Sequence, residues 1–325
     1  MTSAAGGAAG AGGGAAGVGG DAADTGGVAG VAGVGGAAGT AGGAPGVVGV
    51  IGGGRMGAGI AQVFAAIGSE VVVVEGDAGA AEAARGRIEK GLRTAADRGS
   101  LGGTSPQEAL SRVRIVTDVA ELPAGAELVV EAVPEEADLK VRVLTAAERA
   151  VGDAAVLATN TSSLSITELA AALHRPQRFL GMHFFNPVPP SKLVELVVGP
   201  STATAVRDRA LAWVDALGKT AVVVRDSPGF ATSRLGVLLG LEAIRMLEEG
   251  VADAESIDRA MELGYRHPMG PLRSTDLVGL DVRLAIAEYL QRTLGDRFAP
   301  PQLLRDKVAR GELGRKTGRG FHDWS

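Results

Sequence analysis

The stretch that decides the fold is VVGVIGGGRMG, at residues 47–57. Residues 47–51 form a short apolar, β-branched run, which is typical of a buried parallel strand. The glycines that follow match G-x-G-x-x-G. Gly52 permits a tight turn, Gly54 lets the backbone approach a pyrophosphate, and Gly57 allows a helix to pack close to the strand. We therefore expect a strand, a dinucleotide-binding loop and a helix whose first N–H groups face an anion.

The context of this motif separates it from a chance match. Residues 12–17 fit the same expression, but no strand pattern precedes them. Glu75 ends the next apolar strand pattern, 18 residues after Gly57. A carboxylate there can accept hydrogen bonds from both ribose hydroxyls and would repel a 2′-phosphate, so the pattern predicts NAD(H) rather than NADP(H). The other interpretation is a glycine-rich turn that binds no nucleotide.

Outward from this stretch, apolar strand patterns alternate with helical patterns as far as residue 228. Such alternation predicts an α/β fold, a Rossmann-type doubly wound parallel sheet with helices on both faces. After Asp226-Ser-Pro-Gly229 the patterns are almost all helical, at residues 231–249, 254–263, 276–294 and 301–310. We expect an NAD-binding domain over residues 46–228 and an all-helical domain over residues 229–325.

Composition limits the function classes. The 325-residue chain has no cysteine, which excludes a disulfide scaffold and thiol chemistry. The formal net charge of −5 gives no electrostatic reason to expect nucleic acid or an anionic membrane as partner. No apolar run reaches the roughly 18 residues of a membrane span, so we expect a cytoplasmic protein. No group of His, Asp and Glu has metal-ligand spacing, and no metal is expected.

The first 45 residues stand apart from the rest. Glycine and alanine make up 33 of the first 44 positions, and only Asp21 and Asp24 are ionised there. Such a segment cannot bury enough apolar surface to offset its chain entropy. We expect residues 1–45 to be a disordered tail that is dispensable for activity, or an over-called start of translation.

His183 stands out among four histidines because it ends a predicted strand, where ligands of such folds bind. Twelve residues later, Glu195 interrupts the apolar run at residues 193–197, and a carboxylate in that setting needs a partner. A histidine oriented by a carboxylate is the usual general base near neutral pH. From spacing alone, a structural histidine and a surface glutamate explain the pattern equally well.

The segment Asn160-Thr-Ser-Ser163 follows another predicted strand. Its serines either orient a substrate hydroxyl or cap a helix that starts near Ser165, and composition favours capping for Ser163 and Ser165. The chain has no G-x-S-x-G sequence, so a nucleophilic serine is not expected.

Eight segments, in order from residue 47 to the C-terminus, resemble the short-chain L-3-hydroxyacyl-CoA dehydrogenase family. The resemblance implies NAD-dependent oxidation of a (3S)-3-hydroxyacyl-CoA to the 3-ketoacyl-CoA, and the reverse, on short chains such as 3-hydroxybutyryl-CoA. It also implies a homodimer formed through the helical domain. The segments are VIGGGRMGAGIA (50–61), EAVPE (131–135), NTSSL (160–164), HFFNPVP (183–189), KLVE (192–195), DSPGF (226–230), GYRHPMGP (264–271) and GRKTGRGF (314–321).

The resemblance also implies roles for individual residues. His183 is the general base held by Glu195, Ser162 binds the substrate hydroxyl, and Asn186 orients the reacting oxygen or the thioester. Cofactor contacts are implied for Gly52, Gly54, Arg55, Met56, Gly57, Glu75, Glu135, Lys140, Ser162, Asn186 and Lys316.

Substrate contacts are implied for two further residues, Arg98 and Ser233. Coenzyme A phosphates would meet the long helix after Glu75 at Arg98, whereas Gly91, at the other matching position, has no side chain to offer. Ser233 stands where the family often has asparagine, and its hydroxyl has a shorter reach toward substrate.

Two other functions remain open at this point. One is a dehydrogenase of a free hydroxy acid, because the L-gulonate dehydrogenase and lambda-crystallin group looks similar around the same histidine. The other is an NAD-binding protein without catalysis. The joint presence of Ser162, His183, Glu195 and Asn186 argues against the second, since a structural protein needs none of them.

Overall fold

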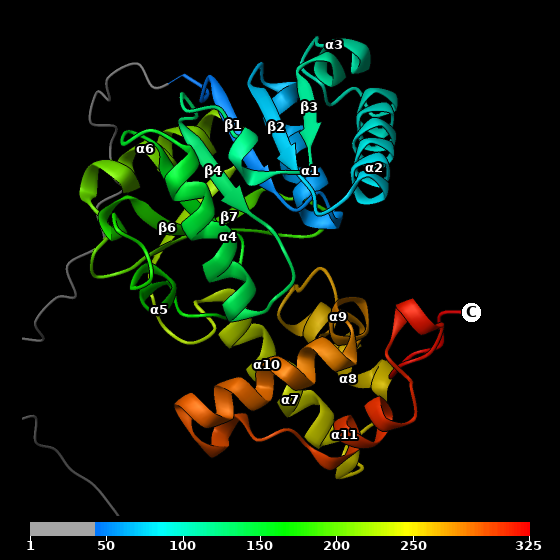
Figure 1. Ribbon diagram of the computed structural model, residues 1–325. Helices are drawn as coiled ribbons and strands as arrows, with labels where there is room; N and C mark the ends of the chain where they lie inside the picture. The colour runs from blue at the N-terminus through cyan, green and yellow to red at the C-terminus, as the bar shows by residue number, and fades with distance from the viewer. Residues whose placement is uncertain (1–42) are drawn as a thin grey trace, which may run out of the picture. The chain divides into compact units, whose positions relative to one another are not determined.

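The computed structural model describes residues 43–325 (Figure 1). The predicted disordered tail, including the second glycine motif at residues 12–17, lies outside these residues apart from its last three positions.

One sheet of eight strands forms the first part of the described chain. Its strand order is β3-β2-β1-β4-β5-β6-β7-β8, and all neighbours are parallel except β6 and β7. The first six strands have the order of dinucleotide-binding folds, in which ligands bind where the order reverses, here between β1 and β4. The strands are β1 (Val47–Ile51), β2 (Glu70–Val74), β3 (Val113–Val116), β4 (Leu128–Glu131), β5 (Val156–Thr159), β6 (Phe179–Phe184), β7 (Leu193–Val198) and β8 (Thr220–Arg225).

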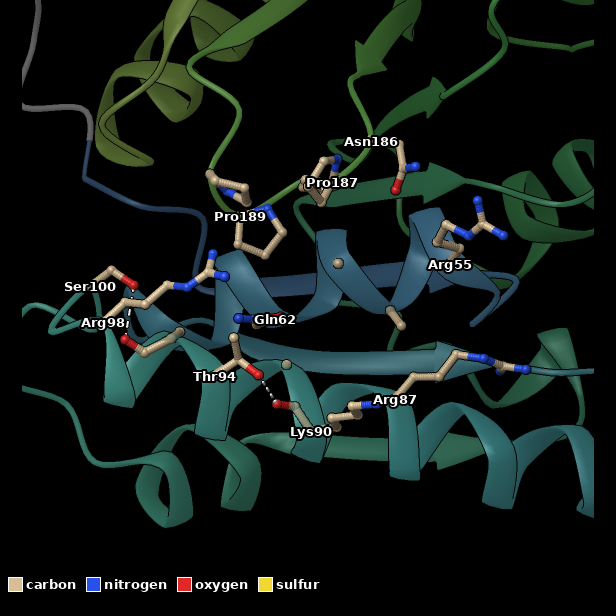
Figure 2. Close-up of a pocket in the computed structure, with 16 residues that line it drawn as sticks. Arg55, Gln62, Arg87, Lys90, Thr94, Arg98, Ser100, Asn186, Pro187 and Pro189 are labelled. Carbon is tan, nitrogen blue, oxygen red and sulfur yellow. Dashed lines mark hydrogen bonds between the residues drawn. The ribbon is translucent and has the colours of Figure 1, made fainter. Parts of the chain in front are cut away.

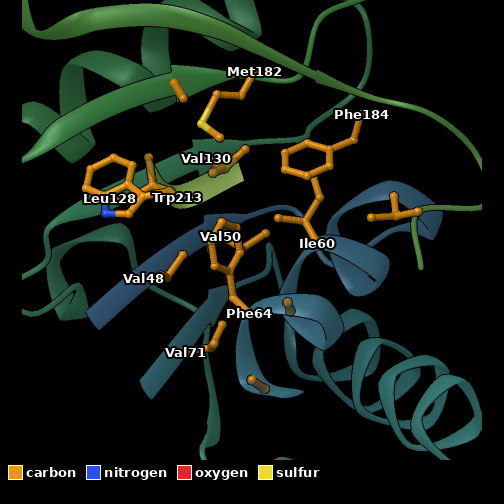
Figure 3. Close-up of a cluster of buried hydrophobic side chains, with 14 of the residues drawn as sticks. Val48, Val50, Ile60, Phe64, Val71, Leu128, Val130, Met182, Phe184 and Trp213 are labelled. Atoms are coloured by element: carbon orange, nitrogen blue, oxygen red, sulfur yellow. The ribbon is translucent and has the colours of Figure 1, made fainter. Parts of the chain in front are cut away.

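Helices cover both faces of the sheet because alternate strand residues point to opposite sides. On one face, Val48 and Val50 pack with Phe64 of α1 (Arg55–Ala66) and Trp213 of α6 (Thr204–Ala216), as Figure 3 shows. The same cluster includes apolar residues of α2 (Ala78–Asp97). On the other face, Ile51 packs in a cluster with residues of α4 (Ala137–Ala150) and α5 (Ile166–Ala170). Both faces are therefore buried, as the apolar strand patterns require.

The remaining chain is helical and has its own core. Val237, Leu272 and Leu290 belong to one buried cluster there. Its helices are α7 (Thr232–Glu248), α8 (Ala254–Gly264), α9 (Pro271–Val278), α10 (Leu280–Leu294) and α11 (Gln302–Ala309), with 3-10 turns η3 (Asp296–Phe298) and η4 (Arg315–Thr317). Earlier in the chain lie α3 (Pro106–Ser111), η1 (Val119–Glu121) and η2 (Pro176–Arg178).

The predicted fold class is confirmed, and two element predictions need correction. The single helix expected at residues 276–294 is wrong, because Gly279, with φ +105°, separates α9 from α10. Helix α3 was missed, although the Ser105 side chain accepts a hydrogen bond from Glu108 N and Pro106 opens the helix. Among the helices of residues 43–325, none is long and apolar enough to cross a membrane.

Candidate active site

The loop after β1 has the backbone that a dinucleotide requires. Gly52 has φ +92°, a conformation that residues with a side chain rarely adopt. A Cβ on Gly57 would lie 1.7 Å from the Gly52 carbonyl oxygen, so only glycine lets α1 pack this close to the loop. A Cβ on Gly54 would meet nothing within 4 Å, which leaves space over the loop for a ligand. No side chain from the described residues 43–325 caps α1, so its first N–H groups are available to an anion.

Glu75 lies beside this loop, as its sequence position predicts. It follows β2, is half-buried, and its Oε1 accepts a hydrogen bond from Gly53 N at 2.7 Å. Within residues 43–325 no hydrogen bond engages its Oε2. The glycine loop, the uncapped helix and this carboxylate together fit a dinucleotide with a free ribose 2′-hydroxyl.

His183 and Glu195 face each other across the antiparallel strands β6 and β7. His183 Nδ1 lies 2.9 Å from Glu195 Oε2, and the two residues are 6% and 0% exposed. The imidazole also contacts the rings of Phe185 and Phe230, with centroid distances of 4.4 and 6.0 Å. No hydrogen bond from the described part of the chain reaches His183 Nε2.

Glu195 is held by the start of α7 as well as by His183. Its carboxylate accepts hydrogen bonds from Ala231 N at 3.1 Å, from Thr232 N at 3.0 Å and from Thr232 Oγ1 at 2.5 Å. Burial alone would raise the pKa of Glu195, but the hydrogen bonds from His183 and Thr232 outweigh it and hold the pKa below its ordinary value. Glu195 is therefore an anion at neutral pH, and it orients Nδ1–H of His183 toward itself.

The loop after β5 carries Ser162. Glu135 Oε1 accepts hydrogen bonds from Ser162 N at 2.9 Å, from Ser163 N at 3.2 Å and from Thr161 Oγ1 at 2.5 Å. On the other side, Ser233 Oγ donates to the Ser162 carbonyl oxygen at 3.2 Å. Both backbone groups of Ser162 are thus fixed, and its hydroxyl makes no hydrogen bond within residues 43–325.

The capping prediction for this segment is half correct. The Ser165 side chain accepts a hydrogen bond from Glu168 N and caps α5, as predicted. The prediction for Ser163 is wrong, because its Oγ lies 3.3 Å from Glu135 Oε1 and caps no helix.

A cavity of about 590 Å³ adjoins the glycine loop, between α1, α2 and the segment 186–190 (Figure 2). Figure 2 shows Asn186 and Arg55 at one end of it and Arg98 and Ser100 at the other. Its lining contains four cationic side chains and no carboxylate: Arg55, Arg87, Lys90 and Arg98. The cavity can therefore hold an elongated ligand with negative charge.

The side chain of Gln62 occupies the space beside Gly91. A Cβ on Gly91 would lie 2.2 Å from Gln62 Oε1, so the amide of Gln62 fills the space that a larger residue would need. The polar surface at this point of the cavity comes from α1 instead of α2.

The structure brings together most of the predicted site residues and leaves one apart. His183 and Glu195 are in contact, Ser162 lies between Glu135 and Ser233, and Asn186 shares one cavity with Arg98. Lys316 is bound to Asp281 instead, with Nζ 2.6 Å from both carboxylate oxygens, and no hydrogen bond joins it to the other site residues described.

Sequence reasoning missed Glu131, Arg87 and Lys90. Glu131 ends the apolar strand β4 and is 0% exposed. Like Glu195, Glu131 is a carboxylate within an apolar strand, so the same pattern predicts a buried, partnered side chain there. No sequence signal distinguishes Arg87 and Lys90 from other charges on α2.

Comparison with known proteins decides the family. A model described as "3-hydroxyacyl-CoA dehydrogenase, NAD binding domain" matches residues 47–227, and one described as "3-hydroxyacyl-CoA dehydrogenase, C-terminal domain" matches residues 229–324. This chain belongs to the 3-hydroxyacyl-CoA dehydrogenase family. As a member of that family it is an oxidoreductase with NAD as cofactor, and the resemblance drawn from the eight sequence segments is confirmed.

Individual relatives of this chain support the same family assignment. A probable 3-hydroxybutyryl-CoA dehydrogenase of Bacillus subtilis is 43% identical over 272 residues, covering 83% of this chain and 94% of that protein. The mitochondrial hydroxyacyl-coenzyme A dehydrogenase of Homo sapiens is 39% identical over 279 residues, covering 84% of this chain and 89% of that protein. The crystal structure of the (S)-3-hydroxybutyryl-CoA dehydrogenase of Ralstonia eutropha is similar with a TM-score of 0.82 and 40% identity, covering 87% of this chain and 100% of that one.

Proposed function

We propose that this protein interconverts (3S)-3-hydroxyacyl-CoA and 3-ketoacyl-CoA with NAD, on short acyl chains such as 3-hydroxybutyryl. The observation that carries the thioester assignment is the cavity of about 590 Å³ that adjoins the glycine loop and is lined by four cations and no carboxylate. Coenzyme A is long and carries several phosphates, whereas a free short hydroxy acid would not fill this cavity and has a single carboxylate for its four cations.

His183 is the proposed catalytic base. Glu195 accepts the hydrogen bond from Nδ1–H, so the lone pair lies on Nε2, the nitrogen that the other described residues leave free. Nε2 removes the proton of the C3 hydroxyl during oxidation and returns it to the C3 oxygen during reduction. The buried Glu195 anion stabilises the imidazolium that forms. Such positioned proton transfer contributes about 10²–10⁴-fold to a rate.

Ser162 and Asn186 are proposed to position the substrate. The Ser162 hydroxyl would bind the C3 oxygen, because both backbone groups of this residue are held and only the hydroxyl is left for a ligand. Asn186 would orient the thioester from the end of the cavity nearest the loop. We propose that Ser233 acts on the substrate through Ser162, since its hydroxyl donates to the Ser162 carbonyl.

The glycine loop is proposed to hold NAD. The N–H groups at the start of α1, beside Arg55 and Met56, would bind its pyrophosphate, and the free Oε2 of Glu75 would bind its adenosine ribose. When bound, NAD would act as the two-electron oxidant by accepting a hydride from the substrate. Lys316 is also proposed as a cofactor contact, which requires it to leave the Asp281 carboxylate that binds it in this structure.

We propose residues 46–228 as the NAD-binding domain and residues 229–325 as a helical substrate and dimerisation domain. Large apolar side chains remain exposed on α7, α9 and α10, a feature that supports a homodimer through this part: Leu235, Leu238, Leu239, Leu277, Val278 and Val282. Light scattering would give the mass of two chains, and Leu235→Lys/Leu239→Lys would reduce it to one. We further propose a cytoplasmic location, which cell fractionation would test, and full activity after deletion of residues 1–45.

A panel of substrates tests the proposed reaction. Purified protein should oxidise NADH, followed by its absorbance, when acetoacetyl-CoA is added, and rates should fall as the acyl chain lengthens. Oxidation of free 3-hydroxy acids without any reaction on the thioesters would contradict the proposal and favour a free-acid dehydrogenase.

A further inference from the structure

Glu131 is a buried carboxylate that the proposed reaction does not use. It ends β4 and is 0% exposed. Its oxygens accept hydrogen bonds from Val133 N at 2.7 Å, from Lys140 Nζ at 2.7 Å and from Thr159 Oγ1 at 2.6 Å. A carboxylate so completely bound offers nothing to a ligand, so its function must act through its neighbours.

Lys140 is the neighbour that leads toward the site. Its side chain is 1% exposed, and its ammonium reaches Glu131 Oε1 at 2.7 Å, Glu135 Oε2 at 3.3 Å and the Val133 carbonyl oxygen at 3.2 Å. Its hydrogen bonds go to Glu131 and to the Val133 carbonyl, and Glu135 Oε2 lies at ion-pair distance from the same nitrogen. Lys140 is thus held between the carboxylates of Glu131 and Glu135, with only 1% of its side chain exposed.

Glu135 connects this pair to the substrate loop. Lys140 holds Oε2, while Oε1 accepts the backbone N–H groups of Ser162 and Ser163. Burial alone would raise the pKa of Glu135, but Lys140 and the hydrogen bonds from Thr161 and Ser162 lower it, so the group is an anion at neutral pH. The position of the Ser162 loop thus depends on where Lys140 places the Glu135 carboxylate.

We propose that Glu131 and Lys140 are positioning residues that hold Glu135 and, through it, set the place of the Ser162 hydroxyl against the C3 oxygen of the substrate. This inference rests on the proposed function, because it requires Ser162 to contact the substrate. It gives Lys140 a role different from the cofactor contact that the family resemblance implies. Small displacements matter here, since a 1 Å error in a reacting geometry can cost about 100-fold in rate.

The test is the double variant Glu131→Gln/Lys140→Met, which removes both charges together and leaves neither partner as an unpaired buried charge. With acetoacetyl-CoA, kcat should fall about 10–100-fold. KM and the NADH Kd should stay within about threefold of the unchanged protein, because binding contacts are intact. The matched control is Glu148→Gln/Arg175→Met, which removes another ion pair of α4 whose carboxylate is 3% exposed. The kcat of this control should stay within about twofold of that of the unchanged protein.

Hydrogen exchange gives a readout that does not depend on activity. Amides of the peptide covering residues 160–165 should exchange about tenfold faster in the double variant than in the control, because two of them lose a well-held acceptor. Unchanged exchange there, or unchanged kcat, would overturn the inference. So would a tenfold weaker NADH Kd with kcat retained, which would make Lys140 a cofactor contact. An unchanged protein that reduces no thioester would instead contradict the proposed function, while the exchange result would still decide the positioning role.

If the double variant does not fold, Glu135→Gln and Glu135→Ala keep the inference testable. Glutamine retains an acceptor for Ser162 N and alanine does not, so kcat should fall further in Glu135→Ala. Equal kcat in both variants and the unchanged protein would overturn the proposal.

Discussion

Glu195 Oε2 lies 2.9 Å from His183 Nδ1, and the two residues are direct partners in the register of β6 and β7. The start of α7 fixes the same carboxylate through Ala231 N and Thr232 N. The His183–Glu195 pair is therefore built from the sheet but held in part by the helical segment. A change at the beginning of α7 reaches the imidazole through Glu195.

The lowered pKa of Glu195 predicts how this pair affects acid stability. Its folded-state pKa lies below the ordinary value of 4.5, because hydrogen bonds outweigh burial. The carboxylate therefore contributes its full stability above the unfolded-state pKa, and this contribution is lost as pH falls through the lower folded-state pKa. Urea unfolding from pH 7 to pH 3 should show Glu195→Gln losing less stability than the unchanged protein below about pH 4.5. Identical pH profiles for the two proteins would refute this, and Glu70→Gln, at the exposed start of β2, should match the unchanged protein.

Two Gly→Ala variants separate backbone packing from helix propensity. In Gly57→Ala the new methyl group would meet the Gly52 carbonyl oxygen at 1.7 Å, so α1 must move away from the loop. We expect a loss of about 1–3 kcal/mol in the free energy of unfolding and an NADH Kd at least about tenfold weaker. Gly86→Ala in α2 meets nothing within 4 Å and should stabilise the protein by about 0.5–1 kcal/mol with NADH binding unchanged. Calorimetry would measure the stability of each variant, and fluorescence titration would measure its NADH Kd. A Gly57→Ala protein with unchanged stability and unchanged NADH Kd would show that the loop tolerates displacement.

The cationic cavity predicts a specific kinetic change. Lys90→Ala and Arg98→Ala should each raise the KM for acetoacetyl-CoA about tenfold, because each removes a charge-assisted contact to a phosphate, and kcat should change little. The truncated N-acetylcysteamine thioester, which has no nucleotide, should show no such increase. Arg93→Ala is the control on the same helix, because Arg93 is paired with Glu89 and 68% exposed. An equal increase in KM for both thioesters would place the cavity outside the coenzyme A site.

The glycine loop and Glu75 could be predicted from sequence because their requirements are local. Gly52 and Gly57 satisfy a turn and a close helix contact within a few residues of each other, and Glu75 lies at a fixed distance along the next strand. The pairing of His183 with Glu195 was left open by spacing alone. It depends on the antiparallel register of β6 and β7, which no local pattern gives.

Other features depend on contacts between distant segments and were missed for that reason. Ser163 has the composition of a helix cap, but Glu135, 28 residues earlier, binds it instead. At Gly279 the backbone has a positive φ, which ends α9 and starts α10 although the side-chain pattern continues as in one helix. The cations of α2 can be recognised as cavity residues only in the folded structure, where α1 and the segment 186–190 line the same cavity.

The measurement that tests the central claim most directly compares His183→Gln with the unchanged protein in acetoacetyl-CoA reduction, followed by NADH absorbance, alongside NADH Kd by fluorescence. We expect kcat to fall about 10²–10⁴-fold in His183→Gln because the general acid–base is gone. We expect the NADH Kd to stay within about threefold, because the glycine loop is untouched. A His183→Gln protein that kept kcat within about tenfold of the unchanged protein, with NADH bound normally, would contradict the assignment of His183 as the catalytic base.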